Sequence, residues 1–459
     1  MVQHSEPLRE LIVVGGGLAG SEAAWQVASR GIQVKLIEMR PTLQTGVHTT
    51  GLLAEIVCSN SLGSKLLDRA NGLLQAEARE LGSLLLECAQ ATALPAGGAL
   101  AVDRVAFAEL VTRKIEEHPG INIHRQEATE LPDAPAIVAS GPLTSSRLAA
   151  AIHQFSGQKH LFFYDAIAPI VNLESIDMSI AFYASRYQRG EKAEGDYLNL
   201  PLTEYEYTQF AEALRTAERI PLRPFEQEIT DGVRAGSSEH FEGCLPIEVL
   251  ANRHPTALSF GPMRPTGIRD PRTGKRPAAV VQLRQDNLAG SLYNLVGFQT
   301  NLTHADQKRV FRMLPGLERA EFERFGEMHR NTFIASPVLL QPTLQSRTRP
   351  DLFFAGQITG VEGYMGNIAT GLLAGINAAR YLTSLPPLEF PPTTMLGALC
   401  SYICHADLDH FQPMKANFGI LPPLDNPTAK KAERNIQYAH RSLRDLHTLI
   451  QTHSLGVVS

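Results

Sequence analysis

Apolar residues along this chain recur with two spacings, one typical of buried strands and one typical of helices that cover a sheet. Continuous apolar runs at residues 11–14 and 32–37 predict two strands. Between them a stretch rich in small residues, with Ala19, Ala23 and Ala24, predicts a helix that can pack closely on a sheet. The order strand, helix, strand predicts a βαβ unit at the start of the chain.

The same patterning continues toward residue 165. Further apolar positions predict helices at residues 64–88 and 102–117 and strands at residues 121–124 and 137–138. Ser145 and Ser146 follow the last of these strands and can cap another helix. We therefore expect the first part of the chain to be an alternating α/β structure.

The middle of the chain is different, because it is richer in proline, tyrosine and charged residues. Its short apolar runs predict strands at residues 167–171, 278–283 and 292–296. The first pattern returns at residues 352–355, where an apolar strand leads into Gly356, a glycine-rich loop and a helix of small residues. These changes predict an α/β fold in which residues 1–165 and 331–459, the latter with C-terminal helices, form one domain. Residues 166–330 are predicted to form an inserted α+β substrate domain.

Three glycines between the first strand and helix have the spacing of a dinucleotide-binding turn. Gly15 turns the chain, Gly17 lets the backbone approach a pyrophosphate, and Gly20 lets helix and strand pack. The helix N-terminus offers free N–H groups and partial positive charge to a phosphate. Glu38 lies 18 residues after Gly20, where an acid can bind ribose hydroxyls. A structural glycine turn in some other α/β protein is the alternative interpretation.

The glycine spacing alone does not indicate whether the cofactor is NAD or FAD. The second segment of cofactor type, which begins at Gly356, favours FAD because the chain must return to close the pocket. The two segments together supply the candidate cofactor-binding residues, which are Gly15, Gly16, Gly17, Leu18, Ala19, Gly20, Glu38, Gly356, Gln357, Gly360, Gly363, Tyr364, Asn367, Ala369 and Thr370.

Composition narrows the class of protein. Of the 459 residues, 44% are hydrophobic and 19% charged, as in ordinary soluble globular proteins. No stretch approaches the roughly 20 apolar residues that span a bilayer, and no signal peptide pattern opens the chain, so a cytoplasmic location without membrane contact is expected. The formal net charge of −5 argues against a general nucleic-acid binder, so any such site must be a local patch.

Two of the five cysteines lie in segments suited to chemistry. Cys58 lies at the expected start of a helix, where a thiol pKa is lowered. Cys244 lies in an irregular loop just before Pro246. A packed core cysteine is the alternative interpretation for each. The remaining cysteines, for which we expect a place in the core, are Cys88, Cys400 and Cys404. Neither their spacing nor that of neighbouring histidines predicts a metal site or a disulfide framework.

Several longer segments resemble one family, the TrmFO folate- and FAD-dependent tRNA (uracil-5-)-methyltransferases, over about residues 9–447. The segments that carry the resemblance are GGGLAGSEAAWQVASRGIQVKLIEMRP, CSNSL, FEGCLPIE, GPMRPTGI, FAGQITGVEGYMGNIATGLLAGINAA and NFGILPPL. The glycine motif is shared with many flavoproteins, whereas EMRP, CSNSL, FEGCLPIE and GYMGN are far more specific. The resemblance implies a Rossmann-like FAD-binding fold of the two-dinucleotide flavoprotein type, related to GidA.

The resemblance also implies a reaction. The T-loop uridine of tRNA, position 54, would become 5-methyluridine, with methylenetetrahydrofolate as carbon donor and reduced FAD, recharged by NADH or NADPH, as reductant. Cys244 would be the thiolate that adds to uracil C6. Cys58 would lie near the flavin and act on the methylene adduct or as general acid and base. Tyr364 is a candidate to stack on folate or base, with an ordinary packed aromatic as the alternative. No obligate protein partner is implied.

A methyltransferase of this kind must draw its target base out of a structured loop, and phosphate contacts must offset that energy. The richest basic stretch is residues 253–284, with seven basic residues against one acid, Asp270. We expect it to be an exposed, loop-rich surface for RNA phosphates, although ordinary surface charge is the alternative. The candidate RNA-binding residues are Arg264, Arg269, Arg272, Lys275 and Arg276.

Three other functions remain open from the sequence. A GidA-type enzyme would modify the tRNA wobble uridine with FAD and folate, with the help of a partner GTPase, but would lack EMRP and FEGCLPIE. A small-molecule FAD oxidoreductase would not need the arginine-rich insertion, nor Cys244 in a loop without a redox partner. A non-catalytic flavin-binding RNA protein would not need two cysteines in such settings.

Overall fold

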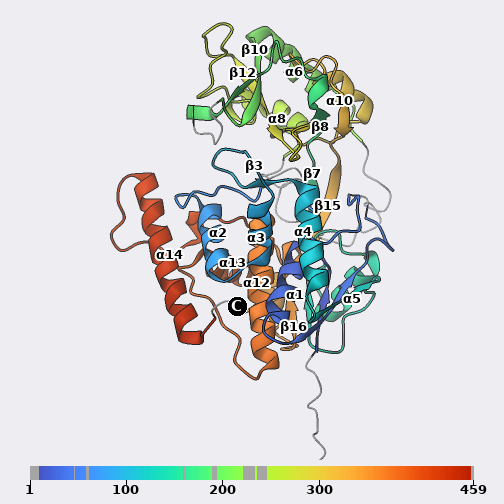
Figure 1. Ribbon diagram of the computed structural model, residues 1–459, viewed down its shortest axis with the longest axis vertical. Helices are drawn as coiled ribbons and strands as arrows, with labels where there is room; N and C mark the ends of the chain where they lie inside the picture. Colours follow the sequence, from blue (N-terminus) through green and yellow to red (C-terminus); the bar gives the residue numbers. More distant parts are fainter. Residues whose placement is uncertain are drawn as a thin grey trace, which may run out of the picture.

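The computed structural model describes residues 10–45, 47–57, 61–158, 161–188, 194–220, 233–234 and 245–455. The molecule is elongated and has two lobes along its long axis (Figure 1). We call them the first lobe, built on a five-stranded sheet, and the second lobe, built on a six-stranded sheet. The first lobe contains both ends of the described chain, and the second lobe lies between them in sequence.

The sheet of the first lobe is entirely parallel. Its strands, in spatial order, are β16 (Leu352–Phe354), β6 (Ala136–Val138), β1 (Glu10–Val14), β2 (Gln33–Glu38) and β5 (Ile121–Arg125). All five were expected from their apolar runs. A strand from the end of the chain therefore pairs with strands from its beginning, and the two cofactor-type segments meet in one sheet.

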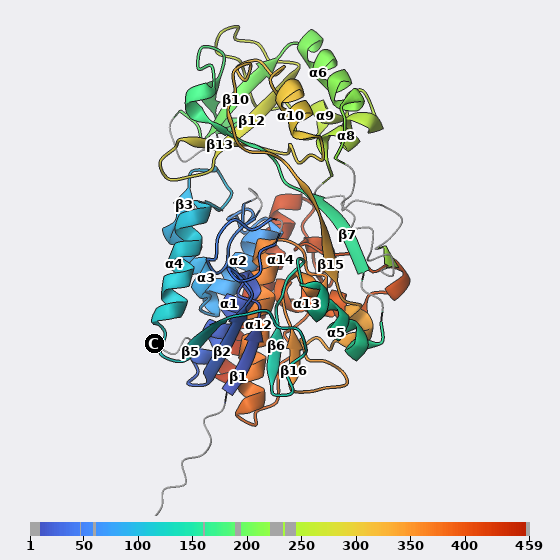
Figure 2. The same ribbon diagram turned by 90° about the vertical axis from the view of Figure 1, so that its right-hand side faces the viewer.

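Two long helices cross closely beside this sheet. α1 (Leu18–Ala28) connects β1 and β2, and α12 (Tyr364–Leu382) packs against it (Figure 2). A Cβ atom at Gly371 would lie 2.2 Å from the Ala19 carbonyl oxygen, and one at Gly375 would lie 2.8 Å from that of Ala23. Only glycine allows this approach, which explains the run of small residues and brings the N-termini of the two helices together.

One predicted element is wrong in its extent. The stretch 64–88 is not one helix, because it contains α2 (Ala70–Glu80) and the start of α3 (Leu84–Ala91). Gly82 has a φ of +73°, which ends the helical path, and the Ser83 hydroxyl accepts a hydrogen bond from Leu86 N to start the next helix. The apolar periodicity continues across the break, so it does not reveal the two helices.

The remaining elements of the first lobe follow the predictions more closely. α4 (Arg104–Glu117) begins at Asp103, whose carboxylate accepts hydrogen bonds from Val105 N and Ala106 N. α5 (Ser146–Ser156) is capped by the Ser145 hydroxyl, as expected. Three short elements complete this part, namely β3 (Ala93–Leu94), β4 (Ala101–Val102) and α11 (Ser336–Leu339).

The second lobe has an antiparallel sheet with helices packed on it. Its strands, in spatial order, are β14 (Phe322–Arg324), β8 (Ile170–Asn172), β13 (Leu292–Leu295), β12 (Ala279–Gln285), β10 (Tyr197–Leu202) and β9 (Phe182–Ala184). The α-helices among its described residues are α6 (Glu204–Thr216), α8 (Ile247–Arg253), α9 (Ala257–Phe260) and α10 (His304–Phe311). Of the predicted strands, 278–283 and 292–296 correspond closely to β12 and β13, whereas the run at 167–171 becomes strand only at Ile170.

A strand pair runs between the lobes. β7 (Leu161–Ala166) and β15 (Met328–Phe333) pair antiparallel, with β11 (Val233–Arg234) beside β7 (Figure 2). Hydrogen bonds also join the lobes directly. Arg104 lies 2.6 Å from the Asp286 carboxylate, Gly97 N donates to Asp196 at 2.6 Å, and Arg324 donates to the Val57 carbonyl at 3.0 Å. These contacts fix the position of one lobe relative to the other.

The C-terminal helices pack on α2. α13 (Met395–His405) and α14 (Lys431–His453) meet at Glu77, which accepts hydrogen bonds from Met395 N, Leu396 N and the Ser442 hydroxyl. Burial raises the pKa of Glu77 to about 7. Along the described chain we find no helix with the length and apolar content that a membrane span requires.

Candidate functional site

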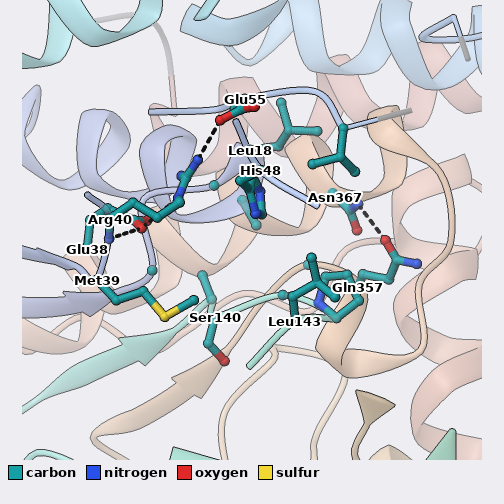
Figure 3. Close-up of a pocket in the computed structure, with 18 of the residues that line it drawn as sticks. Leu18, Glu38, Met39, Arg40, His48, Glu55, Ser140, Leu143, Gln357 and Asn367 are labelled. Atoms are coloured by element: carbon teal, nitrogen blue, oxygen red, sulfur yellow. Dashed lines mark hydrogen bonds and ion pairs between the residues drawn. The ribbon is translucent and has the colours of Figure 1, made fainter. Parts of the chain in front are cut away.

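A cavity of about 780 Å³ lies at the carboxyl ends of the parallel strands of the first lobe (Figure 3). Gly15, Glu38, Ala139 and Gly356 end or follow four of those strands, and all four line it. The carboxyl edge of a parallel sheet is the usual binding crevice of such folds.

Two helix N-termini point into this cavity. The N-cap residues of α1 and α12 are Gly17 and Gly363, which have no side chain to satisfy the first N–H groups. The first turns of both helices contribute lining residues, among them Leu18 and Asn367. A Cβ atom built on Gly17 would meet nothing within 4 Å, so this position faces open space. The arrangement suits a diphosphate, since each N-terminus carries partial positive charge.

The other motif glycines are required by close packing. Gly15 has a φ of +101°, and a Cβ at Gly20 would lie 1.7 Å from the Gly15 carbonyl oxygen. A Cβ at Gly16 would lie 2.5 Å from the Leu53 side chain. These residues shape the turn, while Gly17 is the one that leaves room beside it.

Glu38 is held in place by its neighbours (Figure 3). One carboxylate oxygen accepts a hydrogen bond from Gly16 N at 2.7 Å, and the other accepts from the Arg40 backbone and guanidinium at 2.9 Å. Burial opposes ionisation of Glu38, but the hydrogen bonds and charge of Arg40 outweigh it, so the pKa of Glu38 lies below its ordinary value. The site therefore holds a fixed carboxylate.

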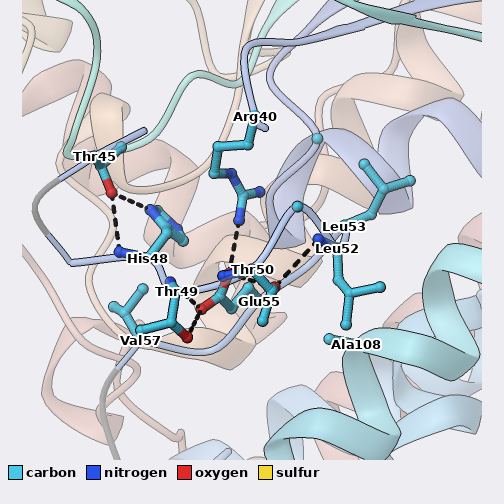
Figure 4. Close-up of polar contacts among 12 residues, drawn as sticks. Arg40, Thr45, His48, Thr49, Thr50, Leu52, Leu53, Glu55, Val57 and Ala108 are labelled. Carbon is cyan, nitrogen blue, oxygen red and sulfur yellow. Dashed lines mark hydrogen bonds and ion pairs between the residues drawn. The ribbon is translucent and has the colours of Figure 1, made fainter. Parts of the chain in front are cut away.

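The segment after β2 folds over the cavity around a second carboxylate (Figure 4). Glu55 accepts hydrogen bonds from the backbone and hydroxyl groups of Thr49 and Thr50, and it pairs with Arg40 at 3.0 Å. Burial raises the pKa of Glu55, but these donors and the nearby His48 hold it below its usual value. The resulting loop places His48 at the cavity, with its Nδ1 atom 2.6 Å from the Thr45 hydroxyl.

A second cavity, of about 1250 Å³, adjoins the first between the lobes. Val57, Pro142, Gln357 and Tyr364 line both cavities. The residues that line the second cavity alone are Ser61, Leu62, Gly63, Asn71, Ala99, Tyr197, Arg284, Val296, Asn331, Glu362, Gly363, Met365 and Lys415. A molecule in one cavity would thus touch a molecule in the other across shared side chains.

Buried polar atoms without partners mark both cavities. Asn331 of β15 is 1% exposed, and neither its amide nitrogen nor its oxygen has a hydrogen-bond partner in the described chain. The side-chain oxygen of Asn367 at the first cavity is likewise without a donor among the described residues. Such groups are rare in native proteins, because each carries an uncompensated desolvation penalty. Ligands that supply the missing hydrogen-bond partners would remove this desolvation penalty.

The structure brings most predicted cofactor residues together. Those that line the first cavity are Gly15, Gly17, Leu18, Ala19, Glu38, Gly356, Gln357, Tyr364 and Asn367, and Gly363 lines the second. Gly16, Gly20, Gly360, Ala369 and Thr370 are not among the described lining residues of either cavity. Thr370 instead supports the site, because its hydroxyl accepts a hydrogen bond from Gly356 N at 3.0 Å.

The cysteines divide into two groups. Cys58 and Cys244, the predicted reactive pair, lie outside the described residues. Cys88, Cys400 and Cys404 are buried in the core, as expected. Burial raises the pKa of Cys88 to about 11 and that of Cys404 to about 12, and it raises the pKa of Cys400 as well. These three thiols are therefore held protonated and are unsuited to attack.

Of the basic residues in the stretch 253–284, one lies in a cavity and not on the predicted surface. Arg264, Arg269, Lys275 and Arg276 are exposed on an irregular loop of the second lobe, and Arg272 there pairs with Asp270 at 2.8 Å. Arg284 does not belong to this surface, because it lies in β12, is 8% exposed and lines the second cavity. A basic residue in a central strand is easily mistaken for surface charge when only local composition is considered.

Fold and site together define an α/β protein of the dinucleotide-binding class, with a second cavity between its lobes. A family model described as "Glucose inhibited division protein A" matches residues 10–386. Relatives from Heliobacterium modesticaldum and Symbiobacterium thermophilum, both named methylenetetrahydrofolate–tRNA-(uracil-5-)-methyltransferase TrmFO, are 55% and 56% identical. These alignments cover 95% and 94% of this chain and 96% and 95% of the relatives. The chain therefore belongs to the GidA family and, within it, to the TrmFO methyltransferases.

A solved structure shares the fold. Aquifex aeolicus GidA superposes with a TM-score of 0.65 at 16% sequence identity, over 96% of this chain and 75% of that chain. At this identity the likeness concerns the fold alone. It supports the GidA-related architecture that the sequence resemblance implies.

Proposed function

We propose that this protein converts the T-loop uridine of tRNA, position 54, to 5-methyluridine, with methylenetetrahydrofolate as carbon donor and FAD as redox cofactor. The observation that carries the proposal is the extensive identity, over nearly the whole chain, with relatives named for the folate-dependent uracil-5 methylation of tRNA. The adjoining cavities support it, because this reaction requires a redox cofactor, a folate and a uracil ring to be in contact.

The residues of the first cavity fit FAD. The uncapped N-termini of α1 and α12 suit its pyrophosphate, and the Glu38 carboxylate suits a ribose. The unpaired oxygen of Asn367 can accept a hydrogen bond from the cofactor. When bound, FAD supplies the two electrons that the transferred carbon needs to become a methyl group, and NADH or NADPH restores them.

The second cavity fits the folate and the uracil. Tyr364, at the boundary between the cavities, offers a ring for stacking. Arg284 suits an anionic group of the ligand, and Asn331 offers both a donor and an acceptor to a heterocycle. We assign residues 166–330 to a substrate domain, since its sheet contributes the far wall of this cavity through Tyr197 and Arg284.

Cys244 performs the covalent step, and Cys58 assists the later steps. The Cys244 thiolate adds to uracil C6, and the electron pair displaced from the C5–C6 bond makes C5 a nucleophile for the folate methylene. Loss of the C5 proton and departure of tetrahydrofolate leave an exocyclic methylene, and after its reduction the thiolate is released. Cys58 acts on the methylene adduct or in proton transfer. Val57, the residue before Cys58, lines both cavities, which supports this assignment.

Incubation with a tRNA transcript tests the proposal. Purified protein with FAD, NADPH and methylenetetrahydrofolate carrying a labelled methylene carbon is expected to convert about one uridine per transcript to labelled 5-methyluridine, located in the T-loop by nucleoside analysis. A transcript with cytidine in place of that uridine is the control and should remain unlabelled. Label at the wobble position would instead indicate the GidA-type reaction, and no label would contradict the proposal. Since tRNA is its substrate, we propose that the protein acts in the cytoplasm.

Asn331→Leu is expected to weaken folate binding while it stabilises the ligand-free protein. Leucine has nearly the same size and removes two buried unsatisfied polar atoms, so the ligand-free protein should be more stable by about 1 kcal/mol. Folate binding should weaken by about ten-fold, since a hydrogen-bonding side chain is lost. Urea unfolding and folate titration measure the two effects. In the matched variant Asn294→Leu the lost amide is bonded to the Pro169 carbonyl, so stability should fall. A destabilised Asn331→Leu protein with normal folate affinity would contradict this role.

A further inference from the structure

An exposed tyrosine lies against the arginine-rich loop of the second lobe, residues 261–278. Tyr187 is 60% exposed and has a φ of 58° and a ψ of 25°, a left-handed conformation that is uncommon for a residue with a side chain. Exposed aromatic rings seldom need such a backbone. Strained conformations of this kind concentrate at functional sites, where the surrounding structure holds them.

The surrounding structure does hold Tyr187 against that loop. A Cβ atom at Gly267 would lie 3.4 Å from both Cδ atoms of the Tyr187 ring and 3.1 Å from its backbone nitrogen, so the ring lies against a glycine backbone. Tyr187 N also donates a hydrogen bond to the Gly267 carbonyl at 3.4 Å. Gly267 itself has a φ of +81°, which disfavours any other residue there.

The residue before Tyr187, Arg186, anchors the arginine-rich loop through hydrogen bonds. The Arg186 guanidinium donates to the Gln282 side chain at 2.8 Å, to the Thr266 carbonyl at 3.1 Å and to the Arg264 carbonyl. Arg276 in turn donates to the Thr266 hydroxyl at 3.3 Å. The contacts between these two segments therefore hold the Tyr187 ring close to the loop that carries two exposed arginines, Arg264 and Arg276.

This combination has the chemistry of a single-stranded RNA contact. Unpaired bases stack on aromatic side chains, and neighbouring phosphates bind arginine. We propose that Tyr187 is a stacking residue for an unpaired base of the tRNA, while Arg264 and Arg276 contact the adjoining phosphates. The inference rests on the proposed function and deepens it, since it assigns a base contact on the second lobe in addition to phosphate contacts.

Tyr187→Ala tests the stacking. We expect the dissociation constant for an unmodified tRNA transcript, measured by fluorescence anisotropy with the full-length holoprotein, to rise about ten-fold. Tyr187→Phe keeps the ring and should stay within about two-fold of the wild type. Tyr205→Ala is the matched control, because Tyr205 is 74% exposed but lies between Glu204 and Glu206, which repel phosphate. It should bind tRNA normally.

Salt dependence distinguishes stacking from charge. Loss of a stacked ring leaves the slope of log K against log salt unchanged, whereas Arg276→Gln should reduce that slope by about 1. KM for tRNA should rise in Tyr187→Ala while KM for folate stays the same. Normal tRNA affinity in Tyr187→Ala, an equal loss in Tyr187→Phe, or an equal loss in Tyr205→Ala would each overturn the inference. A wild-type protein that forms no 5-methyluridine would instead overturn the proposed function.

Discussion

Cys244→Ala is expected to lower 5-methyluridine formation by at least about 10⁴-fold, the scale of losses when a covalent nucleophile is removed. Without the thiolate, uracil C5 stays a poor nucleophile, and neither folate nor reductant can compensate. Binding of FAD should remain, because every described residue that lines the first cavity is unchanged. Single-turnover nucleoside analysis measures the first effect, and the flavin absorption spectrum measures the second.

Cys88→Ala is the matched control for this prediction. The Cys88 thiol is buried, and burial raises its pKa to about 11, so its loss should affect stability and leave turnover intact. Covalent trapping with a 5-fluorouridine T-loop RNA should place the adduct on Cys244. An adduct on Cys58, or full turnover by Cys244→Ala, would assign the attack to a different group.

Gly20→Ala is expected to destabilise the ligand-free protein by about 3 kcal/mol or more, at the upper end of overpacking effects. Its Cβ atom would lie 1.7 Å from the Gly15 carbonyl oxygen, a backbone atom that cannot rotate away, so α1 must separate from β1. Urea unfolding of apoprotein should show the loss, and the purified variant should be colourless.

Gly17→Ala is expected to weaken FAD binding without changing the stability of the fold. Gly17 has a φ of −74°, which alanine adopts readily, and its Cβ would meet nothing within 4 Å. The apoprotein should therefore unfold like the wild type, whereas FAD affinity should fall by at least about ten-fold, because the added methyl group occupies the space given to the pyrophosphate. If Gly17→Ala bound FAD normally, the diphosphate would not lie at this turn.

Local patterning was enough to predict the sheet of the first lobe. β1, β2, β6 and β16 are largely buried apolar runs, β1 and β16 lead into glycines and β2 ends at an acid. The edge strand β5 instead alternates apolar and polar residues. The break at Gly82 was missed because the leucines on either side keep helical spacing across it. A glycine followed by a capping serine was the available signal.

The site was predictable where it depends on the glycine turns and was missed where it depends on distant contacts. Arg40 and Glu55 meet across a loop, and their pairing has no periodic signature. Asn331 lies in a strand whose sequence, MHRNTF, does not distinguish a cavity-facing amide from a surface one. Its importance emerges only when both of its polar atoms are found buried without partners.

The position of β16 has a consequence for how the protein is made. β6 ends at Val138 and its neighbour β16 begins at Leu352, so the ribosome must translate about 210 residues between them. At about 5–20 residues per second this takes some tens of seconds. During that time the face of α1 that later meets Gly371 and Gly375 is uncovered. Nascent chains should therefore acquire the nucleotide pocket late in synthesis, after the second lobe has left the exit tunnel.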